Sequence, residues 1–386
     1  MKYTVKLASI VFALTTQALF AELTVNIERE GAEKFSFCVE VSGEPTFAKS
    51  LRRNLELSGA FVAKPAAAAS IKIAGATGGS IRAEGRGKAL GFQSAAQDAK
   101  KARTEARLFA DKLIETFAKQ KGFSNDPIVF AHRKGRVSDI YMCYPDGYDM
   151  RKLTNDGREA VGPRWKDGKS IFYTGFLGDG GPKVYELDSQ TGAKKLRWSF
   201  KGLTTGATIS PDGGRVAIIL SIHGNPELYV INIAAGTWTR LTNTRNASEG
   251  QPSWSPDGSQ IVYVSDESRY PQLYVIDVAT KSKRRLTSKG SQNVDPDWGS
   301  NGLVTYITKR GGESYVAIVD PKAGEASAKL VSSAGKWEHP SWARDGRHLV
   351  ASRDGALFVL DCEENGDEPK RLFMNEGNWI TPSWSR

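Results

Sequence analysis

The stretch QPSWSPDGSQIVYVSD, Gln251–Asp266, decides the fold, because it is one copy of a unit that recurs along the chain. It combines Pro and Trp, a Pro-Asp-Gly turn, and an alternating segment rich in β-branched residues. Asp tolerates the tight turn and Gly supplies a positive φ angle. The stretch therefore predicts two short strands joined by a turn.

The same unit returns at a nearly constant spacing. Further copies are GPRWKDGKSIFYTG from Gly162, ATISPDGGRVAIIL from Ala207, DPDWGSNGLVTYIT from Asp295 and HPSWARDGRHLVAS from His339. Their turn residues, Asp167, Asp212, Asp257, Asn301 and Asp345, are 45, 45, 44 and 44 positions apart. TPSWSR, Thr381–Arg386, is a sixth copy, and the copy at Ala207 carries Ile209 in place of Trp. A period near 44 with several strands per unit indicates an all-β, six-bladed propeller.

Each unit holds four candidate strands, and the last unit shows how the ring closes. After PSWS and QIVYVS, the copy at Gln251 continues with QLYVID, Gln272–Asp277, and RRLT, Arg284–Thr287. The final copy stops after its first strand, and PIVFAHR, Pro127–Arg133, supplies the missing second strand from the other end of the repeat region. One blade is therefore predicted to contain both ends of residues 126–386, which removes exposed sheet edges.

Repetition also decides between two interpretations of the prominent side chains. We expect Trp165, Trp254, Trp298, Trp342 and Trp384 to pack between blades rather than to stack on a ligand. The turn Asp residues resemble catalytic carboxylates when taken singly, but their recurrence predicts a structural role in the turns.

Residues 22–125 lack the repeat and predict a small α/β domain. Lys34–Val41 alternates like a strand, and a helix is expected from Thr46, which can cap it, to Gly59. A second helix from Ala95 carries the stripe Ala102, Ala106, Phe109, Leu113 and Phe117, with Gly122 at its end. The linker to the propeller is placed near Phe123–Pro127.

The first 21 residues resemble a secretory signal peptide. Lys2 and Lys6 precede the apolar segment Leu7–Leu14, and we place the cleavage site after Ala21. The apolar segment is too short to span about 30 Å of hydrocarbon. We therefore expect an exported protein that is not inserted in the membrane.

Composition and motifs argue against several other classes. The chain has 386 residues and a net charge of +10, but the charges are interleaved, without the basic stripe of a nucleic-acid-binding protein. Cys38, Cys143 and Cys362 are too few and too distant for a disulfide framework, and no Cys/His cluster has metal-ligand spacing. GRGKALG from Gly85 fits neither phosphate-loop pattern, and the four His are scattered. We expect no catalytic residue, cofactor or metal.

The chain resembles the TolB family of the Tol–Pal envelope system of Gram-negative bacteria. The resemblance rests on the P-x-W-S-P-D-G, LYVID and RLT pattern, on ELTVNIEREG (Glu22–Gly31), on RLFADKLIETFAKQKGFSNDPIVFAHR before the repeats, and on the chain end inside a Trp unit. It implies a monomeric periplasmic scaffold that supports outer-membrane integrity and envelope constriction at division. The departures lie between Gly43 and Gln93 and at Ile209.

The resemblance also implies two partner sites. A peptidoglycan-associated lipoprotein (Pal) would dock at the propeller mouth whose loops lead into the first strands. These loops hold polar residues suited to a hydrogen-bonded rim: Glu159, Glu249, Gln251, Asn293, Asp295, Glu338, His339, Asn378 and Thr381. An inner-membrane protein like TolA would bind the N-terminal segment Glu22–Glu33, with Glu22, Leu23, Thr24, Val25, Asn26, Ile27 and Glu28 as a strand that adds to a partner sheet.

Two alternatives from other classes stay open. A propeller hydrolase or lyase would need charged or metal-binding side chains converging in the central channel. A carbohydrate-binding propeller would need several of the repeat Trp side chains to face solvent.

Overall fold

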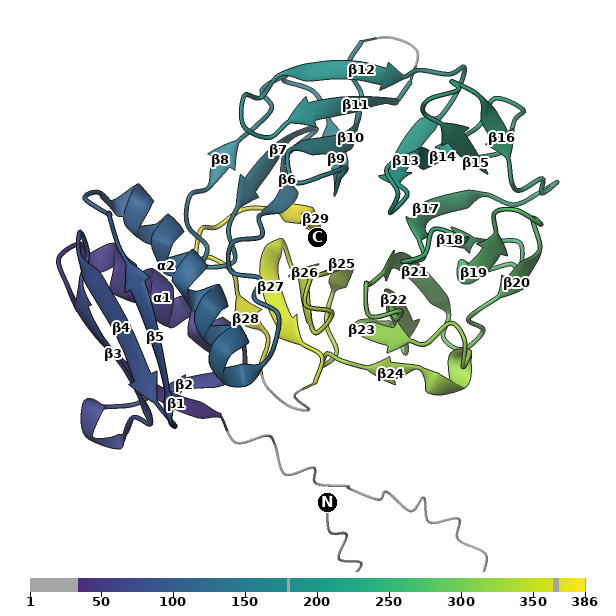
Figure 1. Cartoon of the computed structure of the whole chain (residues 1–386). Helices are drawn as coiled ribbons and strands as arrows, with labels where there is room; N and C mark the ends of the chain where they lie inside the picture. Colours follow the sequence, from purple (N-terminus) through teal and green to yellow (C-terminus); the bar gives the residue numbers. More distant parts are fainter. Residues whose placement is uncertain (1–33, 179–180, 364–367, 386) are drawn as a thin grey trace, which may run out of the picture. The chain divides into compact units, whose positions relative to one another are not determined.

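The structure is a computed structural model that describes residues 34–178, 181–363 and 368–385. The predicted signal peptide and the predicted partner-binding segment Glu22–Glu33 lie outside the described residues. Within them, an α/β region is followed by six four-stranded antiparallel sheets arranged around a common centre (Figure 1). The prediction of a six-bladed propeller preceded by a small α/β domain is confirmed.

Each blade is a sheet of four strands, named here from the innermost strand outward. Blade 1 contains β29 (Trp379–Trp384), β6 (Ile128–Lys134), β7 (Val137–Cys143) and β8 (Arg151–Lys152); blade 2 contains β9 (Ala160–Trp165), β10 (Ser170–Gly175), β11 (Lys183–Asp188) and β12 (Lys194–Trp198); blade 3 contains β13 (Thr204–Ile209), β14 (Arg215–Leu220), β15 (Glu227–Asn232) and β16 (Trp238–Arg240). Blade 4 contains β17 (Glu249–Trp254), β18 (Gln260–Ser265), β19 (Gln272–Asp277) and β20 (Lys283–Arg285); blade 5 contains β21 (Gln292–Trp298), β22 (Val304–Arg310), β23 (Glu313–Val319) and β24 (Lys329–Leu330); blade 6 contains β25 (Trp337–Trp342), β26 (His348–Arg353), β27 (Ala356–Asp361) and β28 (Lys370–Arg371). The fourth strand of blade 2, unclear in the sequence, is β12.

The predicted closure is confirmed in blade 1. The C-terminal strand β29 pairs antiparallel with β6, with Trp384 opposite Ile128. The indole N–H of Trp384 donates to the Asp126 carbonyl at 3.0 Å. The strand β29 is therefore the innermost strand of a blade whose second strand begins at Ile128, 251 positions before Trp379.

The repeat Trp side chains pack between blades, as predicted. Trp165 of blade 2 donates its indole N–H to the Ser383 carbonyl of blade 1 at 3.2 Å, and Trp254 of blade 4 donates to the Thr208 carbonyl of blade 3 at 3.1 Å. The turn carboxylates are structural as well. Asp257 accepts from the Ser255 hydroxyl at 2.6 Å and from the Ser259 N–H at 3.0 Å, and these hydrogen bonds lower the pKa of Asp257 to about 2.

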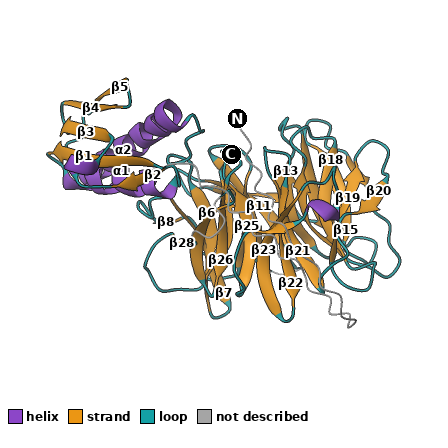
Figure 2. Ribbon diagram, turned by 90° about the horizontal axis from the view of Figure 1, so that it is seen from below, coloured by secondary structure: helices purple, strands orange, loops and turns teal. Residues whose placement is uncertain are grey.

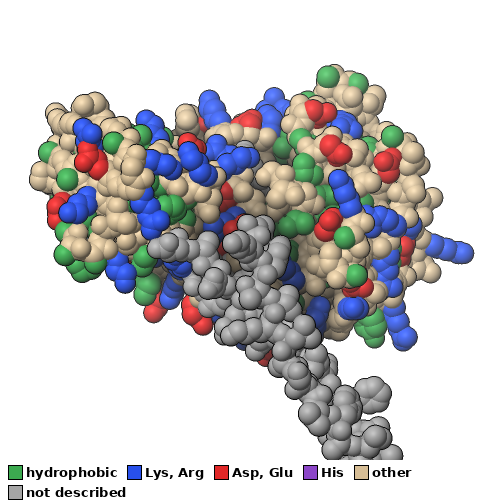
Figure 3. Space-filling model, turned by 60° about the horizontal axis from the view of Figure 1, so that its bottom comes forward, with side chains coloured by type: hydrophobic (Ala, Val, Ile, Leu, Met, Phe, Trp, Pro, Cys, Tyr) green, Lys and Arg blue, Asp and Glu red, His purple; other side chains and the backbone are tan. Residues whose placement is uncertain are grey.

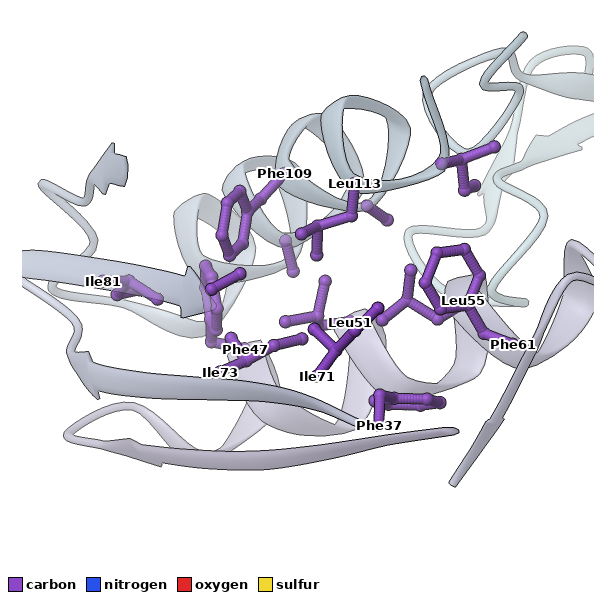
Figure 4. Packing of buried hydrophobic residues seen from close by; sticks show 14 of the residues in the cluster. Phe37, Phe47, Leu51, Leu55, Phe61, Ile71, Ile73, Ile81, Phe109 and Leu113 are labelled. Atoms are coloured by element: carbon purple, nitrogen blue, oxygen red, sulfur yellow. The ribbon is translucent and has the colours of Figure 1, made fainter. Parts of the chain in front are cut away.

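The α/β region is a five-stranded sheet, in the order β2-β1-β3-β4-β5, covered by helices on one face. Its strands are β1 (Phe35–Ser42), β2 (Phe61–Ala63), β3 (Ile71–Ala76), β4 (Ser80–Gly85) and β5 (Lys88–Gln93); its helices are α1 (Pro45–Leu57) and α2 (Ala99–Leu113), the latter followed by a π-helical turn, Ile114–Ala118. Figure 2 shows both long helices in this region, apart from the propeller strands. The predicted stripes are buried: Phe47, Leu51 and Leu55 of α1 meet Phe109 and Leu113 of α2 over the sheet (Figure 4).

Two local predictions in this region are wrong. Thr46 does not cap α1; Glu44 does, accepting from the Thr46 N–H at 3.2 Å, because Pro45 takes the first helical position. Gly122 does not end the second helix, which stops at Lys119 with a left-handed φ of 59°. Gly122 instead lies against Asp111, where a Cβ atom would come within 2.4 Å of the Asp111 Cβ.

The rejected phosphate-loop segment GRGKALG is the β4–β5 hairpin, which the sequence analysis missed. Arg86 and Gly87 form its two-residue turn with φ angles of 47° and 72°, as a tight hairpin turn requires. The linker expected near Phe123–Pro127 is well packed in the structure. Phe123 is buried and meets the Trp384 ring edge-on, with centroids 5.4 Å apart. The domain boundary itself stays a prediction.

Candidate protein-docking site at the propeller mouth

The two ends of the propeller channel are set by the strand connections. In each blade the first strand begins at the same end as the loop between the second and third strands, because neighbouring strands are antiparallel. We call this end the first-strand mouth. The α/β region contacts the opposite end: Arg344, in the turn between β25 and β26, donates to the Gly122 carbonyl at 3.3 Å. The first-strand mouth is therefore the end away from these contacts.

Every first strand carries one residue with a left-handed backbone, and these six positions form what we call the inner ring. The positions are Gly162, Gly206, Gln251, Asp295, His339 and Thr381, with φ angles from 49° to 67°. Each lies at a register shift between the first and second strands of its blade. The bulge redirects the strand and leaves one residue out of the ladder.

Four inner-ring residues are not glycine, and this is energetically unfavourable. A non-glycine residue in the left-handed region costs roughly 1–3 kcal/mol, and such strain gathers at functional sites. Thr381 is the most strained by type, since it is β-branched and has a φ of 50°. Gln251, Asp295, His339 and Thr381 are predicted from the sequence to lie in loops, and this part of the prediction is wrong. The structure places them inside first strands, because the bulge lets pairing continue on both sides.

Asp295 connects three neighbouring blades across the inner ring. Its carboxylate accepts from the side-chain amide of Gln251 in blade 4 and, at 3.0 Å, from the N–H of His339 in blade 6. The Asp295 N–H in turn donates to Gln251 Oε1 at 2.9 Å. On the other side of the channel, the Gly162 N–H donates to Thr381 Oγ1 at 3.4 Å. These bonds hold the side chains of Gln251, Asp295 and Thr381 and the backbone of His339 in place within the inner ring.

Four of the predicted partner-binding residues are buried, and two of them, Asp295 and Thr381, belong to the inner ring, with 6% and 8% of their surface exposed. Glu249 and Asn293 stand two positions before the inner ring and are buried, with 4% and 1% of their surface exposed. Glu249 accepts from Thr244 and Ser265, and Asn293 donates to Gln272. Burial and the nearby Glu227 carboxylate raise the pKa of Glu249 to about 7. Glu249 and Asn293 were assigned to a hydrogen-bonding rim because they are polar. Since side chains alternate between the two faces of a strand, these two point into the protein interior.

The remaining predicted residues lie at the edge of the mouth. Glu338 and Asn378 are exposed, and Glu159 is partly exposed and forms an ion pair with Arg133 at 2.9 Å. The loops beside them hold large apolar side chains that the sequence analysis missed: Phe176 after β10, Tyr270 between β18 and β19, and Met374 between β28 and β29, exposed by 39%, 58% and 78%. The sequence offered only a weak sign of these side chains, a large apolar residue in a loop between strands, because such residues are common.

Other features of the described residues bear on the alternatives. No group of three His, Cys, Asp or Glu side chains within them could hold a metal ion. No helix in the described ranges is long and apolar enough to cross a membrane. Cys38, Cys143 and Cys362 are buried and free. On the part of the surface visible in Figure 3, Lys and Arg side chains are mixed with Asp and Glu, in agreement with the interleaved sequence charges.

Comparison with known proteins supports the family assignment. Over 146 residues the chain is 25% identical to the Tol-Pal system protein TolB of Gluconobacter oxydans, a match covering 37% of this chain and 32% of the relative. Over 126 residues it is 30% identical to the Tol-Pal system protein TolB of Desulfotalea psychrophila, covering 32% of this chain and 28% of the relative. These matches span about a third of the length of the curated relatives.

The fold comparison extends over almost the whole chain. The crystal structure of TolB from Acinetobacter baumannii superposes with a TM-score of 0.81, covering 92% of this chain and 97% of that chain at 21% sequence identity. The family model described as the TolB beta propeller domain matches residues 114–386. The chain therefore belongs to the TolB β-propeller family.

Proposed function

We propose that this protein is a periplasmic, non-enzymatic scaffold of a Tol–Pal envelope system that docks a Pal-like lipoprotein at its first-strand mouth. In this role it supports outer-membrane integrity and constriction at division. The proposal is supported by the relatives, which are named Tol-Pal system protein TolB. The observation that carries it is the inner ring, where four non-glycine residues keep left-handed backbones at the mouth.

The mouth combines the features of a protein-binding surface. Protein interfaces have well-packed apolar anchors, with aromatic residues and Met enriched, inside a polar rim. Tyr270, Phe176 and Met374 offer the apolar contacts, and Glu338 and Asn378 offer exposed polar groups. The inner ring lies between them and is already held by hydrogen bonds, so a partner would not have to order it.

The hydrogen bonds of the inner ring favour binding over catalysis. Asp295 and the nearby Asp297 accept from neighbouring blades, with the Trp342 N–H donating to Asp297 Oδ2 at 2.8 Å. Carboxylates used in this way join blades and are committed to the fold. A general acid or base would instead need a carboxyl group free to approach the atom that gives or takes its proton.

The N-terminal segment Glu22–Glu33 is proposed as the second site, for a TolA-like inner-membrane partner. Its residues Glu22–Glu28 alternate in the sequence like a strand. An extended segment of this kind can add to the exposed edge of a partner sheet, where main-chain hydrogen bonds supply much of the affinity. Deleting Glu22–Glu33 is expected to abolish TolA binding and to leave the melting temperature and lipoprotein binding unchanged.

The decisive experiment is a binding titration of the purified mature chain with the soluble domain of the Pal-like lipoprotein from the same organism. We expect saturable one-to-one binding, and crosslinks from the lipoprotein to loops that contain Tyr270 and Met374. Crosslinks that fall only on the turns between first and second strands would place docking at the other end of the channel. Absence of binding, together with turnover of a hydrolase or lyase substrate, would favour an enzyme.

A further inference from the structure

Glu249 belongs to a set of six equivalent positions beneath the first-strand mouth. Each stands two residues before an inner-ring position and each is buried: Ala160, Thr204, Glu249, Asn293, Trp337 and Trp379. Among these, Glu249 alone carries an ionisable side chain. It faces a second buried carboxylate, Glu227 of β15, which has 0% of its surface exposed. The junction between blades 3 and 4 therefore encloses two acidic groups.

One hydroxyl joins the two acidic side chains. Thr244, in the loop between β16 and β17, contacts Glu227 Oε1 at 3.2 Å and Glu249 Oε2 at 3.1 Å. Its backbone N–H also donates to Glu227 Oε1, at 2.7 Å. The position of this loop thus depends on both carboxyl groups. At the far end of the loop, the Ser248 N–H donates to Asp266 at 2.8 Å.

The junction between blades 4 and 5 has neutral side chains at the two positions that hold carboxyl groups between blades 3 and 4. Gln272 and Asn293 occupy the positions that correspond to Glu227 and Glu249, 45 and 44 residues further along. The Asn293 amide donates to Gln272 Oε1 at 2.6 Å, and Thr287 donates to the same oxygen at 2.9 Å. An amide supplies the hydrogen that joins the pair there. Between two carboxylates, only a bound proton can supply it.

The surroundings of the acidic pair neutralise one charge rather than two. Arg240 donates to Glu227 Oε1 at 2.8 Å, and Ser265 donates to Glu249 Oε1 at 3.1 Å. Lys283 acts on Glu249 from β20 but is itself paired with Glu267. The buried Tyr263 hydroxyl, whose pKa is raised, stays neutral. Among the described residues, none donates a hydrogen bond to Glu227 Oε2, so this buried oxygen lacks a donor next to a second carboxyl group.

We propose that Glu227 and Glu249 together hold one proton and form a pH-responsive contact that sets the β16–β17 loop at the docking mouth. With the proton bound, Thr244 ties the loop down and Gln251, two residues beyond Glu249, keeps its place in the inner ring. When the proton leaves, the two carboxylates repel and the loop loosens. This inference rests on the proposed function only for its consequence, which is tighter docking below neutral pH than above it.

The test measures hydrogen exchange of the Thr244–Ser248 amides in the purified mature chain, without a partner. We expect protection to fall about tenfold or more between about pH 6 and about pH 8, after correction for intrinsic exchange. Glu249→Gln places a permanent donor on this side chain, as Asn293 does in the next junction, and should give protection that does not change with pH. Glu159→Gln, at a partly exposed carboxylate of the same mouth that pairs with Arg133 of blade 1 rather than with the β16–β17 loop, should behave like the wild type.

Two results would overturn the proton-sharing proposal. One is wild-type protection that stays flat across this pH range; the other is a Glu249→Gln variant that keeps the wild-type pH dependence. Lipoprotein affinity is then measured at both pH values with wild type and Glu249→Gln. Loss of all affinity in both proteins would contradict the proposed function and leave the exchange result standing. Affinity that varies equally with pH in both would remove the link between the pair and docking.

Discussion

Arg107 of α2 forms a buried ion pair with Asp146, in the loop between β7 and β8, with 3.1 Å between Nη1 and Oδ2 and exposures of 1% and 0%. The guanidinium also reaches Asp149 at 2.8 Å and stacks over the Tyr144 ring, 3.8 Å from its centroid. On the other helix, the Ser50 hydroxyl donates to Asp146 at 2.7 Å. This cluster joins the α/β region to blade 1 by polar contacts, of which those of Asp146 with Arg107 and Ser50 are buried from water.

Replacing Arg107 by Ala should therefore destabilise the protein strongly. The change leaves the Asp146 carboxylate buried without its cation, and breaking a buried pair in this way costs about 3–5 kcal/mol. Urea unfolding followed by circular dichroism measures the loss. Arg52→Ala, at an exposed position of α1, is the matched control and should change stability by less than about 0.5 kcal/mol. Equal effects of the two substitutions would contradict the role assigned to the pair.

Trp384→Ala should destabilise blade 1, where the C-terminal strand β29 pairs with β6 and closes the ring. The Trp384 side chain is buried between Phe123 and the strands of blade 1, and its truncation is expected to cost about 3–5 kcal/mol. Trp238→Ala serves as the control, because Trp238 lies on an outer strand and is 45% exposed. Thermal melts of both variants should separate them clearly. A loss at Trp238 that matches the loss at Trp384 would argue against closure by the C-terminal strand.

Gly162→Ala tests the backbone of the inner ring without any steric clash. No heavy atom lies within 4 Å of an added Cβ, but the φ angle is +59°, so the variant should lose about 1–2 kcal/mol from backbone strain alone. Gly250→Ala is a control in the equivalent strand of blade 4, with open space and no positive φ. That change should be neutral or stabilise by up to about 1 kcal/mol. Similar losses in the two variants would rule out a special backbone at Gly162.

The sequence was sufficient for the blades because their turns repeat at a fixed spacing. Asp257 and its equivalents marked every connection between first and second strands, and the truncated final unit located the closing pair Trp384 and Ile128. The inner ring was not predicted, since nothing in the residue types of Gln251 or Thr381 indicates a positive φ. Gly162 is a sign in the sequence of a positive φ angle at this repeat position. It indicates the same backbone at the other positions only once they are known to share a β-bulge.

The candidate site was predicted less well than the fold. Polarity alone placed Glu249 and Asn293 on the rim, although the equivalent positions in blades 6 and 1 hold Trp337 and Trp379. Large aromatic residues at a repeat position indicate that it faces inward, and this comparison would have corrected the prediction. Tyr270 and Met374 were missed because single apolar residues in loops are common and carry little information by themselves.

The raised pKa of Glu249 predicts how stability changes with pH. Its value of about 7 in the folded protein exceeds the ordinary 4.5, so the folded state binds the proton more tightly than the unfolded state. The contribution to stability is fully present below about 4.5 and is lost as pH rises through about 7. Glu249→Gln should therefore raise the melting temperature at about pH 8 and change it little at about pH 4, where both the folded and the unfolded wild type carry the proton. A melting temperature lowered equally at both pH values would contradict this.

Tyr270→Ala and Met374→Ala test the proposed docking surface one residue at a time. Both side chains are exposed in loops of the first-strand mouth, so truncation should leave the melting temperature unchanged. If they anchor the lipoprotein, each change should weaken binding about tenfold or more, which corresponds to about 1.4 kcal/mol. Leu196→Ala is the matched control, since Leu196 is similarly exposed but lies on the outer strand β12. Unchanged lipoprotein affinity in both mouth variants would exclude these loops from the interface. Lipoprotein affinity that is weakened only by Leu196→Ala would instead indicate an interface on the outer strands.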